Sequence, residues 1–536
     1  MVMKIRESYR YNDDENHNDN VNPGITEERE QIMKRSRLMY RSDELLKARI
    51  TEQLKEKKIR PEERPAFHLT PRAGWMNDPN GFSWYQGEYH MFYQYNPYDT
   101  QWGPMHWGHA VTKDLIRWEN RPCALAPDTF PDREAGCFSG GAAELPDGRH
   151  LLMYTGCRRE KHLDGTICDV QTQNLAIGDG VDYQKYPGNP VLSELDLPEG
   201  ASRIDFRDPK IWRESDGSWR CVVANRAEDE TGQLLLFTSP DAFHWSYLSK
   251  LAVNHGRFGR MWECPDYFVL DGKSVILMSP QDMEPDSLGF HAGNNVLCMI
   301  GHLDEEDENE CFREEFVHPV DDGIDFYATQ TVLSPDGRRI LTGWMQSWDT
   351  VPYRVDNAKW FGQVSLPREL TICDGRLIQK PVRELEQYRT DKVERRNVAV
   401  DDSRVFTDPA LSGRIADLIF EIRPEEDCRE VEIRFAEDGS HYCSVTYRPQ
   451  DQTLTIDRSH SGVIRDVLHA RTAKVSAADG SLKLRMILDR FSAEIFVNDG
   501  ETVMSMTHYS DPEAEGISVR ARGEAAVDIT RYLLNM

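Results

Sequence analysis

Residues 75–96 read WMNDPNGFSWYQGEYHMFYQYN, a stretch that joins a polar turn to a strand. The turn is WMNDPNG, in which Asn, Pro and Gly favour sharp bends of the backbone. The strand is HMFYQYN from His90, a short run rich in aromatic residues. Asp78 stands in the turn close to Trp75 and Met76, which are unusual neighbours for a surface carboxylate. This combination decides the fold prediction because its two parts recur along the chain.

Four further strand-like runs follow at similar intervals. They are LLMYTG from Leu151, WRCVVAN from Trp219, VILMSP from Val275 and ILTGWMQ from Ile340. The five runs start 61, 68, 56 and 65 residues apart. A recurrent spacing of this size is typical of a β-propeller, in which each repeat is one four-stranded blade. The sequence therefore predicts a five-bladed propeller over residues 63–385.

Residues 400–536 follow a different pattern. The segments VEIRF, SVTYR, LTIDR, LKLRMILDR and AEIFVN alternate apolar and polar residues and are separated by turns. This alternation is typical of a β-sandwich, whose strands have one dry and one wet face. The charged stretch RELEQYRTDKVERRN is expected to link the two domains. The predicted fold class is all-β: a five-bladed propeller, then a C-terminal β-sandwich, with a short helical N-terminal extension.

Residues 1–62 form that extension. Its beginning is polar and is expected to be loose, whereas residues 25–60 are rich in Glu, Lys, Arg and Leu and have no Gly or Pro. This composition predicts a helix. We favour a helix that rests on the main domain over one that mediates oligomer contacts, and a homo-oligomer is left open.

The composition excludes several classes of partner. The chain has 536 residues and a formal net charge of −27, which argues against nucleic acid or an anionic membrane as a partner. No apolar run approaches the roughly 18 residues that span a bilayer, and the N-terminus has no signal-peptide core. We therefore expect a cytoplasmic protein. The 11 cysteines are scattered without a C-x-x-C pair, which favours reduced, buried thiols over disulfides or zinc.

A metal site is not expected either. His106 and His109 have a spacing that suits metal ligands on a helix, but the residue pattern of the surrounding WGPMHWGHAV is typical of loop and strand.

A polar motif stands about a dozen residues before each of the five runs. If each run is the second strand of a blade, its motif lies on or beside the innermost strand. Innermost strands converge on the propeller axis, so the motifs should meet at one mouth of the central channel. The motifs contain Asp78 in WMNDPNG, Phe138 and Ser139 in CFSGG, Asp208 in DFRDPK, Glu263 in WECPD, and Asp325 and Tyr327 in IDFYATQ.

Three carboxylates, Asp78, Asp208 and Glu263, would share that mouth. Carboxylates at close quarters cannot all stay ionised, so the pKa of one is driven up. An ionised nucleophile beside a protonated acid can break a glycosidic bond.

Other residues near the motifs are expected to contact a sugar. The expected apolar walls are Trp75, Trp102, Trp107, Phe138 and Trp262, and the expected hydroxyl ligands are Asn77, Gln94 and Arg207. Each motif by itself could also have a structural role, such as a turn at Asp78. Because all five motifs stand at a similar distance before their strands, we favour one shared site.

These motifs resemble those of the family 32 glycoside hydrolases, the invertase and fructanase family. The resemblance rests on FHLTPRAGWMNDPNG, MFYQYNP, WGPMHWGHAVTKDLIRWE, FSGG, FRDPK, WECPD, DFYATQ and GWMQSW, in the family order, and on DRFSAEIFVNDG near the C-terminus. It covers the chain from about residue 65 onward. It implies a five-bladed propeller with a β-sandwich, and retaining hydrolysis of β-D-fructofuranosides without a metal or organic cofactor.

The resemblance also implies residue roles. Asp78 would be the nucleophile that forms a fructosyl-enzyme, Glu263 the general acid and then base, and Asp208 a stabiliser of the transition state. The fructose pocket would be formed by Asn77, Gln94, Trp102, Phe138, Ser139, Arg207, Tyr327 and Trp344. FSGG departs from the family's frequent FSGS, so Gly141 contributes no hydroxyl.

The expected substrates are sucrose and short fructooligosaccharides, because long polysaccharides do not enter cells. One alternative is sucrose 6-phosphate, for which Arg158, Arg159 and Lys161 are candidate phosphate ligands. Others are a fructosyltransferase of the same fold, a glycosidase acting on arabinose or xylose, and, from a different class, a sugar-binding propeller without activity.

Overall fold

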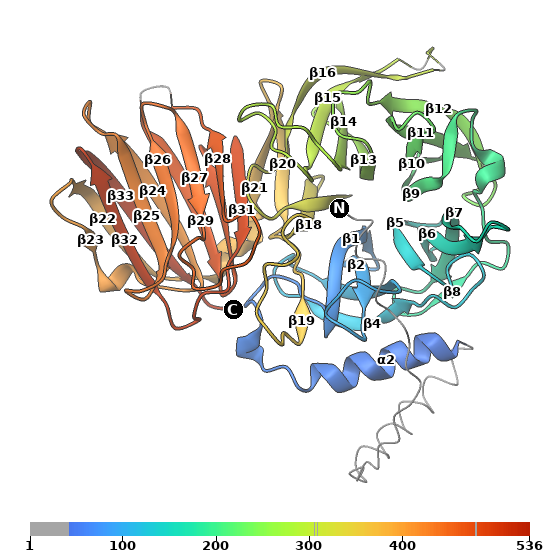
Figure 1. Ribbon diagram of the computed structural model, residues 1–536, viewed down its shortest axis with the longest axis horizontal. Helices are drawn as coiled ribbons and strands as arrows, with labels where there is room; N and C mark the ends of the chain where they lie inside the picture. Colours follow the sequence, from blue (N-terminus) through green and yellow to red (C-terminus); the bar gives the residue numbers. More distant parts are fainter. Residues whose placement is uncertain (1–41, 305, 308, 478–479) are drawn as a thin grey trace, which may run out of the picture.

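The computed structural model describes residues 42–304, 306–307, 309–477 and 480–536. In this part of the chain, five blade-like sheets form a ring beside a two-layered sandwich (Figure 1). The fold class expected from the sequence is therefore confirmed. The described part of the expected N-terminal helix is α2 (Asp43–Glu56). The beginning of that helix and the expected loose segment lie outside the described residues.

The propeller comprises five sheets, each built on four antiparallel strands in sequence order, and a short additional strand joins the first sheet. The first two blades are β1 (Gly74–Tyr85), β2 (Glu88–Asn96), β3 (His106–Thr112), β4 (Glu119–Leu125), and β5 (Gly136–Glu144), β6 (His150–Lys161), β7 (Ile167–Gly178), β8 (Tyr183–Lys185). The third is β9 (Ala201–Arg213), β10 (Trp219–Ala227), β11 (Gly232–Ser239) and β12 (Ser246–Val253). The last two are β13 (Trp262–Leu270), β14 (Lys273–Pro280), β15 (Leu297–Leu303), β16 (Phe312–Pro319), and β17 (Tyr327–Leu333), β18 (Arg339–Trp344), β20 (Arg368–Cys373), β21 (Arg376–Pro381).

The five predicted runs are the second strands of the five blades. They fall on β2, β6, β10, β14 and β18, and each pairs with the strand that precedes it. The polar motifs accordingly fall on or beside the first strands β1, β5, β9, β13 and β17. The phase relation read from the sequence is thus confirmed.

The first strands form the inner ring of the propeller. β1 contacts β5 and β17, β9 contacts β5 and β13, and β13 contacts β17. A short strand from the fifth repeat, β19 (Trp360–Phe361), pairs in parallel with β1 and so ties the last blade to the first. The N-terminal ends of the five first strands therefore lie around one opening.

The sandwich consists of two six-stranded sheets in the described residues after 388. One has the order β22 (Arg389–Val400), β33 (Ala525–Leu534), β24 (Ala416–Pro424), β29 (Leu482–Asp489), β30 (Ser492–Val497), β31 (Thr502–Thr507). The other has the order β23 (Phe406–Thr407), β32 (Gly516–Arg522), β25 (Glu430–Glu437), β26 (Cys443–Arg448), β27 (Thr453–Asp457), β28 (Ala470–Lys474). Phe420 and Leu484 from the first sheet pack with Ile433 and Val445 from the second. Burying each such side chain contributes roughly 1.5–3 kcal/mol.

The charged stretch expected as a linker is largely ordered into the sandwich. Residues Arg383–Tyr388 form the 3-10 helix η4, and β22 begins at Arg389 and pairs with β33 along its length. Short 3-10 helices also occur at η2 (Pro61–Glu63), η3 (Glu194–Asp196) and η5 (Pro409–Leu411). The exact domain boundaries stay predictions.

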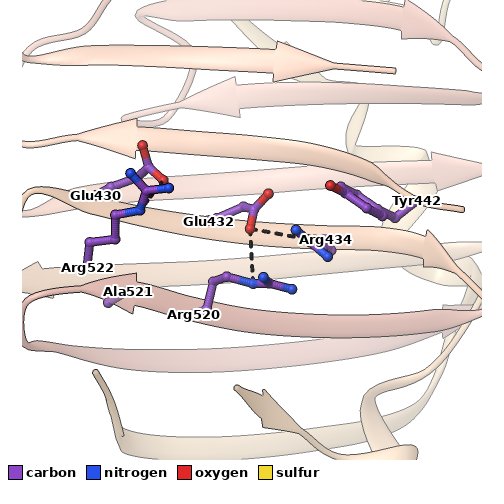
Figure 2. Close-up of a pocket in the computed structure, with 7 residues that line it drawn as sticks. All are labelled: Glu430, Glu432, Arg434, Tyr442, Arg520, Ala521 and Arg522. Carbon is purple, nitrogen blue, oxygen red and sulfur yellow. Dashed lines mark ion pairs between the residues drawn. The ribbon is translucent and has the colours of Figure 1, made fainter. Parts of the chain in front are cut away.

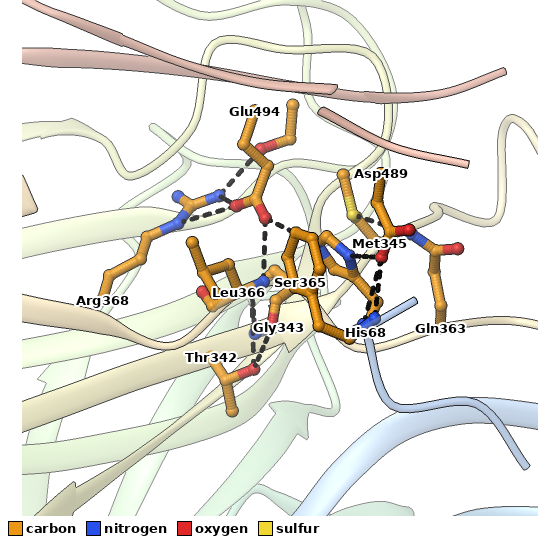
Figure 3. A network of polar contacts seen from close by, with 12 residues as sticks. His68, Thr342, Gly343, Met345, Gln363, Ser365, Leu366, Arg368, Asp489 and Glu494 are labelled. Atoms are coloured by element: carbon orange, nitrogen blue, oxygen red, sulfur yellow. Dashed lines mark hydrogen bonds and ion pairs between the residues drawn. The ribbon is translucent and has the colours of Figure 1, made fainter. Parts of the chain in front are cut away.

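A buried ionic network joins the propeller to the sandwich (Figure 3). Arg368 on β20 pairs with Glu494 on β30, with 2.6 Å between Nη2 and Oε2, and with Asp321 at 3.0 Å. His68 lies between Glu494 (3.0 Å) and Asp489 (2.8 Å). Burial alone would lower the pKa of His68, but its two carboxylate partners outweigh burial and raise the pKa to about 9. The two domains therefore share buried charges, and loss of one partner from such a network costs about 3–5 kcal/mol.

No helix in the described residues is long and apolar enough to cross a membrane.

Candidate active site

The pairing of every first strand with its neighbour is broken at the polar motif. In β1 the register shifts between Met76 and Pro79, so Asn77 and Asp78 together face Gln94. Comparable shifts occur in β5 after Phe138, in β9 between 207 and 210, in β13 after Glu263 and in β17 after Tyr327. A bulge of this kind re-aims a side chain that regular pleating would send to one face. Asp78 therefore stands among aromatic residues because the bulge turns it toward the inner opening.

Three of these bulges contain a proline one or two residues after the motif carboxylate. Pro79 follows Asp78, Pro209 follows Asp208, and Pro265 follows Cys264. Proline has no N–H for the strand ladder, so within sheets it is confined to edges and bulges. Asp208 and Cys264 also have positive φ angles of 64° and 49°. Non-glycine residues rarely adopt this conformation, and it is concentrated at functional sites.

Asp78 is partly buried and is held by two hydrogen-bond donors. Ser139 Oγ donates to Asp78 Oδ2 at 2.7 Å, and Asn77 Nδ2 donates to Oδ1 at 3.0 Å. Burial and the charge of Glu263 raise the pKa of Asp78 to about 6, while the two donors oppose this rise. At neutral pH the carboxyl group is therefore largely ionised.

Glu263 is held by a separate set of donors. Arg207 donates to Oε1 from Nε at 3.0 Å and from Nη2 at 2.8 Å. Gln281 Nε2 (2.7 Å) and the hydroxyl of Tyr327 (2.8 Å) donate to Oε2. Arg207 is held in turn by Asp205, with 2.6 Å between Nη1 and Oδ1. The position of Glu263 is thus fixed by three blades, because its partners come from β9, the end of β14 and β17.

Asp208 is buried beside both of the other carboxylates. Its backbone N–H donates to Thr155 Oγ1 at 2.9 Å, and its Oδ2 accepts from the backbone N–H of Cys264 at 3.0 Å. Burial first, and then the charges of Glu263 and Asp78, raise the pKa of Asp208 to about 7 against the opposing effect of Arg207.

The thiol of Cys264 bridges two of the motifs. Its Sγ lies 3.6 Å from Asp78 Oδ2 and 3.7 Å from Asp208 Oδ2. Together with the pair between Arg207 and Glu263, this contact shows that the structure brings the three carboxylates into one site. Burial and the neighbouring carboxylates raise the pKa of the Cys264 thiol well above its ordinary value, so it stays protonated.

The remaining expected pocket residues divide into an exposed and a buried group. Trp102 is 41% exposed and its ring meets that of partly buried Phe138 edge-on, with 6.0 Å between centroids. Gln94 is buried and donates from Nε2 to the backbone carbonyl of Cys137 at 2.9 Å, so it joins β2 to β5. Buried Asn77, Ser139 and Tyr327 hold the carboxylates as described above.

The expected aromatic walls are wrong at three positions. Trp75, Trp107 and Trp262 are fully buried, and their indole N–H groups donate to Asn77, to the carbonyl of Phe138 and to the carbonyl of Phe258. Trp344 is also fully buried and packs against Trp75 with 5.9 Å between ring centroids. The sugar contact expected of Trp344 is therefore not offered by this arrangement; the four rings support the strands beneath the site.

Gln281 and Asp205 were missed by the sequence reasoning. A signal for Gln281 existed: the motif starts the first strand of a blade, so antiparallel pairing brings the end of the second strand beside it. Glu263 indeed pairs with Ser279, two residues before Gln281. Asp205 stands in the DFRDPK motif itself, two residues before Arg207.

The two histidines with ligand-like spacing each contact another partner. His106 and His109 lie on β3; His106 Nδ1 lies 2.9 Å from the carbonyl of Pro104, and His109 Nε2 lies 3.0 Å from His90 Nδ1. Within the described ranges, no group of three or more His, Cys, Asp or Glu side chains is arranged to hold a metal ion. Catalysis without a metal or organic cofactor stays a prediction.

A polar hollow of about 310 Å³ lies on the outer sheet of the sandwich (Figure 2). Its charges pair within and between strands: Glu432 lies 3.1 Å from Arg434 on the same strand and 3.0 Å from Arg520 on the neighbouring strand. Arg434 also stacks on Tyr442. The hollow is lined by sandwich residues alone and contains none of the three converging carboxylates, so it is separate from the candidate site.

A buried site with an ionised carboxylate and a second, separately held carboxyl group is the equipment of a glycoside hydrolase. Residues 68–381 match the N-terminal domain of glycosyl hydrolases family 32, and residues 384–532 match the C-terminal domain of that family. The chain belongs to this family and is a glycoside hydrolase. The alternatives of a sugar-binding propeller without activity and of an arabinose or xylose glycosidase are therefore wrong.

Relatives and solved structures agree with this assignment. The chain is 34% identical to a sucrose-6-phosphate hydrolase of Escherichia coli, over 86% of this chain and 93% of the relative. It is 35% identical to a raffinose invertase of Escherichia coli, over 88% and 95%. A β-fructofuranosidase of Bombyx mori solved in complex with sucrose superposes with a TM-score of 0.77, at 35% identity over 91% of this chain and 97% of that one.

Proposed function

We propose that this enzyme releases fructose from small β-D-fructofuranosides, sucrose and short fructooligosaccharides, through a covalent fructosyl-enzyme. The observation that carries the proposal is the separate bonding of Asp78 and Glu263. Asp78 receives hydrogen bonds from neutral donors: Ser139, Asn77 and the thiol of Cys264. Glu263 is bonded by Arg207, Gln281 and Tyr327. Two carboxyl groups in one site with different partners suit two different roles.

In the first step, Glu263 gives its proton to the glycosidic oxygen while the Asp78 carboxylate attacks the anomeric carbon. The bond to the leaving group breaks and an ester forms between Asp78 and fructose. In the second step, Glu263 removes a proton from water, the water oxygen attacks the same carbon, and the ester bond breaks. Asp208 accepts hydrogen bonds from fructose hydroxyl groups and stabilises the positive charge of the transition state.

The proposed choice of substrate is supported by the ion pairs of two candidate phosphate ligands. Arg158 pairs with Glu160 and lies over the ring of Phe130, and Arg159 lies 3.4 Å from Asp169. These arginines already have carboxylate partners, which supports an uncharged substrate over a sugar phosphate. Because some relatives are named sucrose-6-phosphate hydrolase, sucrose 6-phosphate is the second candidate substrate. A cytoplasmic location and the oligomeric state stay predictions.

We predict that Asp78→Ala lowers the rate by about 10⁴-fold or more without loss of fold, because no ester can form. Glu263→Ala should cost about 10²–10⁴-fold on sucrose and much less on a fructoside with a good leaving group, which needs little protonation. The measurement is kcat on both substrates, with exposed Glu426→Ala as the control. Equal losses of Glu263→Ala on both substrates would contradict its role as the acid.

We also predict an acid limit to activity. The pKa of Asp78 is about 6, so at lower pH its carboxyl group is protonated and cannot attack. The value of kcat/KM should therefore fall as the pH drops through this range. Ser139→Ala removes a donor that favours the carboxylate, so the pKa of Asp78 should rise and the fall should begin at higher pH. Because Asp208 titrates nearby, the comparison of the two profiles is the test. An unchanged profile in Ser139→Ala would refute the assignment; exposed Ser459→Ala is the control.

The substrate proposal predicts a larger kcat/KM for sucrose and short fructooligosaccharides than for inulin or levan. Rates on these substrates and on sucrose 6-phosphate can be compared under one set of conditions. A tenfold preference for sucrose 6-phosphate, roughly 1.4 kcal/mol of transition-state discrimination, would establish sucrose 6-phosphate as the substrate instead. Faster cleavage of the polymers would show that the enzyme is not limited to small substrates.

A further inference from the structure

Helix α2 is anchored to the outer edge of the first blade. Arg49 Nε donates to the carbonyl of Cys123 on β4 at 2.9 Å, and Glu52 Oε1 accepts from the N–H of the same residue at 3.0 Å. Arg49 also pairs with Asp182 of the second blade at 3.1 Å. β4 is an edge strand, whose outward backbone groups lack a strand partner. Side chains of α2 satisfy both groups of Cys123, so the helix has a fixed register on the propeller.

From this anchored position, α2 reaches the loop between β2 and β3. Lys55 Nζ donates to the backbone carbonyl of Tyr98 at 2.5 Å. Lys47, two turns earlier on the helix, places its ammonium 5.3 Å from the centre of the Tyr98 ring. A charged donor on a backbone carbonyl and a cation over an aromatic ring both favour one position of residue 98.

The loop leads from Tyr98 to the mouth of the site. Asn96 accepts from the N–H of Tyr98 and donates to the carbonyl of Gln101, both at 3.0 Å. Arg354 donates to the carbonyl of Thr100 at 2.8 Å. Trp102 follows Gln101 in the loop; it is 41% exposed, and its ring meets Phe138. Phe138 directly precedes Ser139, the donor to Asp78.

We propose that α2 belongs to the substrate-binding apparatus, with Lys55 as a positioning residue that holds the loop carrying Trp102 at the mouth of the pocket. This rests on the proposed function and on the expectation from the sequence that Trp102 contacts the sugar. Without Lys55 the loop samples more conformations, and its ordering is added to the cost of substrate binding. Loss of such binding raises KM and leaves kcat unchanged, since the carboxylates keep their partners.

The first test is Lys55→Met, which keeps the apolar stem and removes the donor. We expect KM for sucrose to rise roughly three- to tenfold with little change in kcat. Lys55→Arg should restore KM because it supplies a donor, and Lys58→Met, at an exposed position just beyond the end of the helix, should have no effect. A lower melting temperature with unchanged KM would overturn the proposal, because it would mean that Lys55 only stabilises the fold.

The second test asks whether Lys55 acts through Trp102. If it does, KM of Trp102→Ala should be raised, and adding Lys55→Met should raise it no further. Effects on KM that multiply in the double variant would overturn the proposal. An unchanged KM in Trp102→Ala alone would instead remove Trp102 from the proposed sugar pocket, so failure of the proposed function is told apart from failure of this inference.

Discussion

The site depends on a break in strand pairing at the polar motif of each innermost strand. Regular pleating would send successive side chains to opposite faces, and hairpin hydrogen bonds would fix them there. A bulge at each motif releases one or two residues from the ladder. Pro79, Pro209 and Pro265 fit these positions because they need no ladder partner. The motifs of different blades can then face one another across the opening. The contacts between their side chains depend on this arrangement.

Three carboxylates this close repel one another, so their partners decide what each can do. Arg207 compensates Glu263 and is itself held by Asp205. Asp78 has neutral donors and keeps a raised pKa of about 6. The propeller thereby supplies an attacking carboxylate and a separately positioned proton carrier from two different blades. Arg368 and His68 form buried ion pairs with carboxylates of the sandwich. These pairs attach the propeller to the sandwich domain.

Much of this arrangement could be predicted from the sequence. The spacing of the five runs predicts the blades because every blade repeats the same hairpin, and the constant phase of the motifs predicts their convergence. The aromatic walls could not be predicted in this way. Trp75 and Trp262 are close to the motifs in sequence, but bulges make the facing of nearby side chains irregular. Trp107 lies on β3, away from the motifs in sequence. The contact between Lys55 and Tyr98 joins residues from separate elements, and no local pattern encodes it.

The central claim is that Asp78 forms a covalent bond with fructose and that water later attacks the same carbon. Two displacements at one centre retain its configuration. Proton NMR of sucrose hydrolysis, recorded before the released sugar mutarotates, identifies the anomer of fructose that forms first. The account predicts β-D-fructofuranose. The α-anomer as the first product would mean a single displacement by water and would contradict the account.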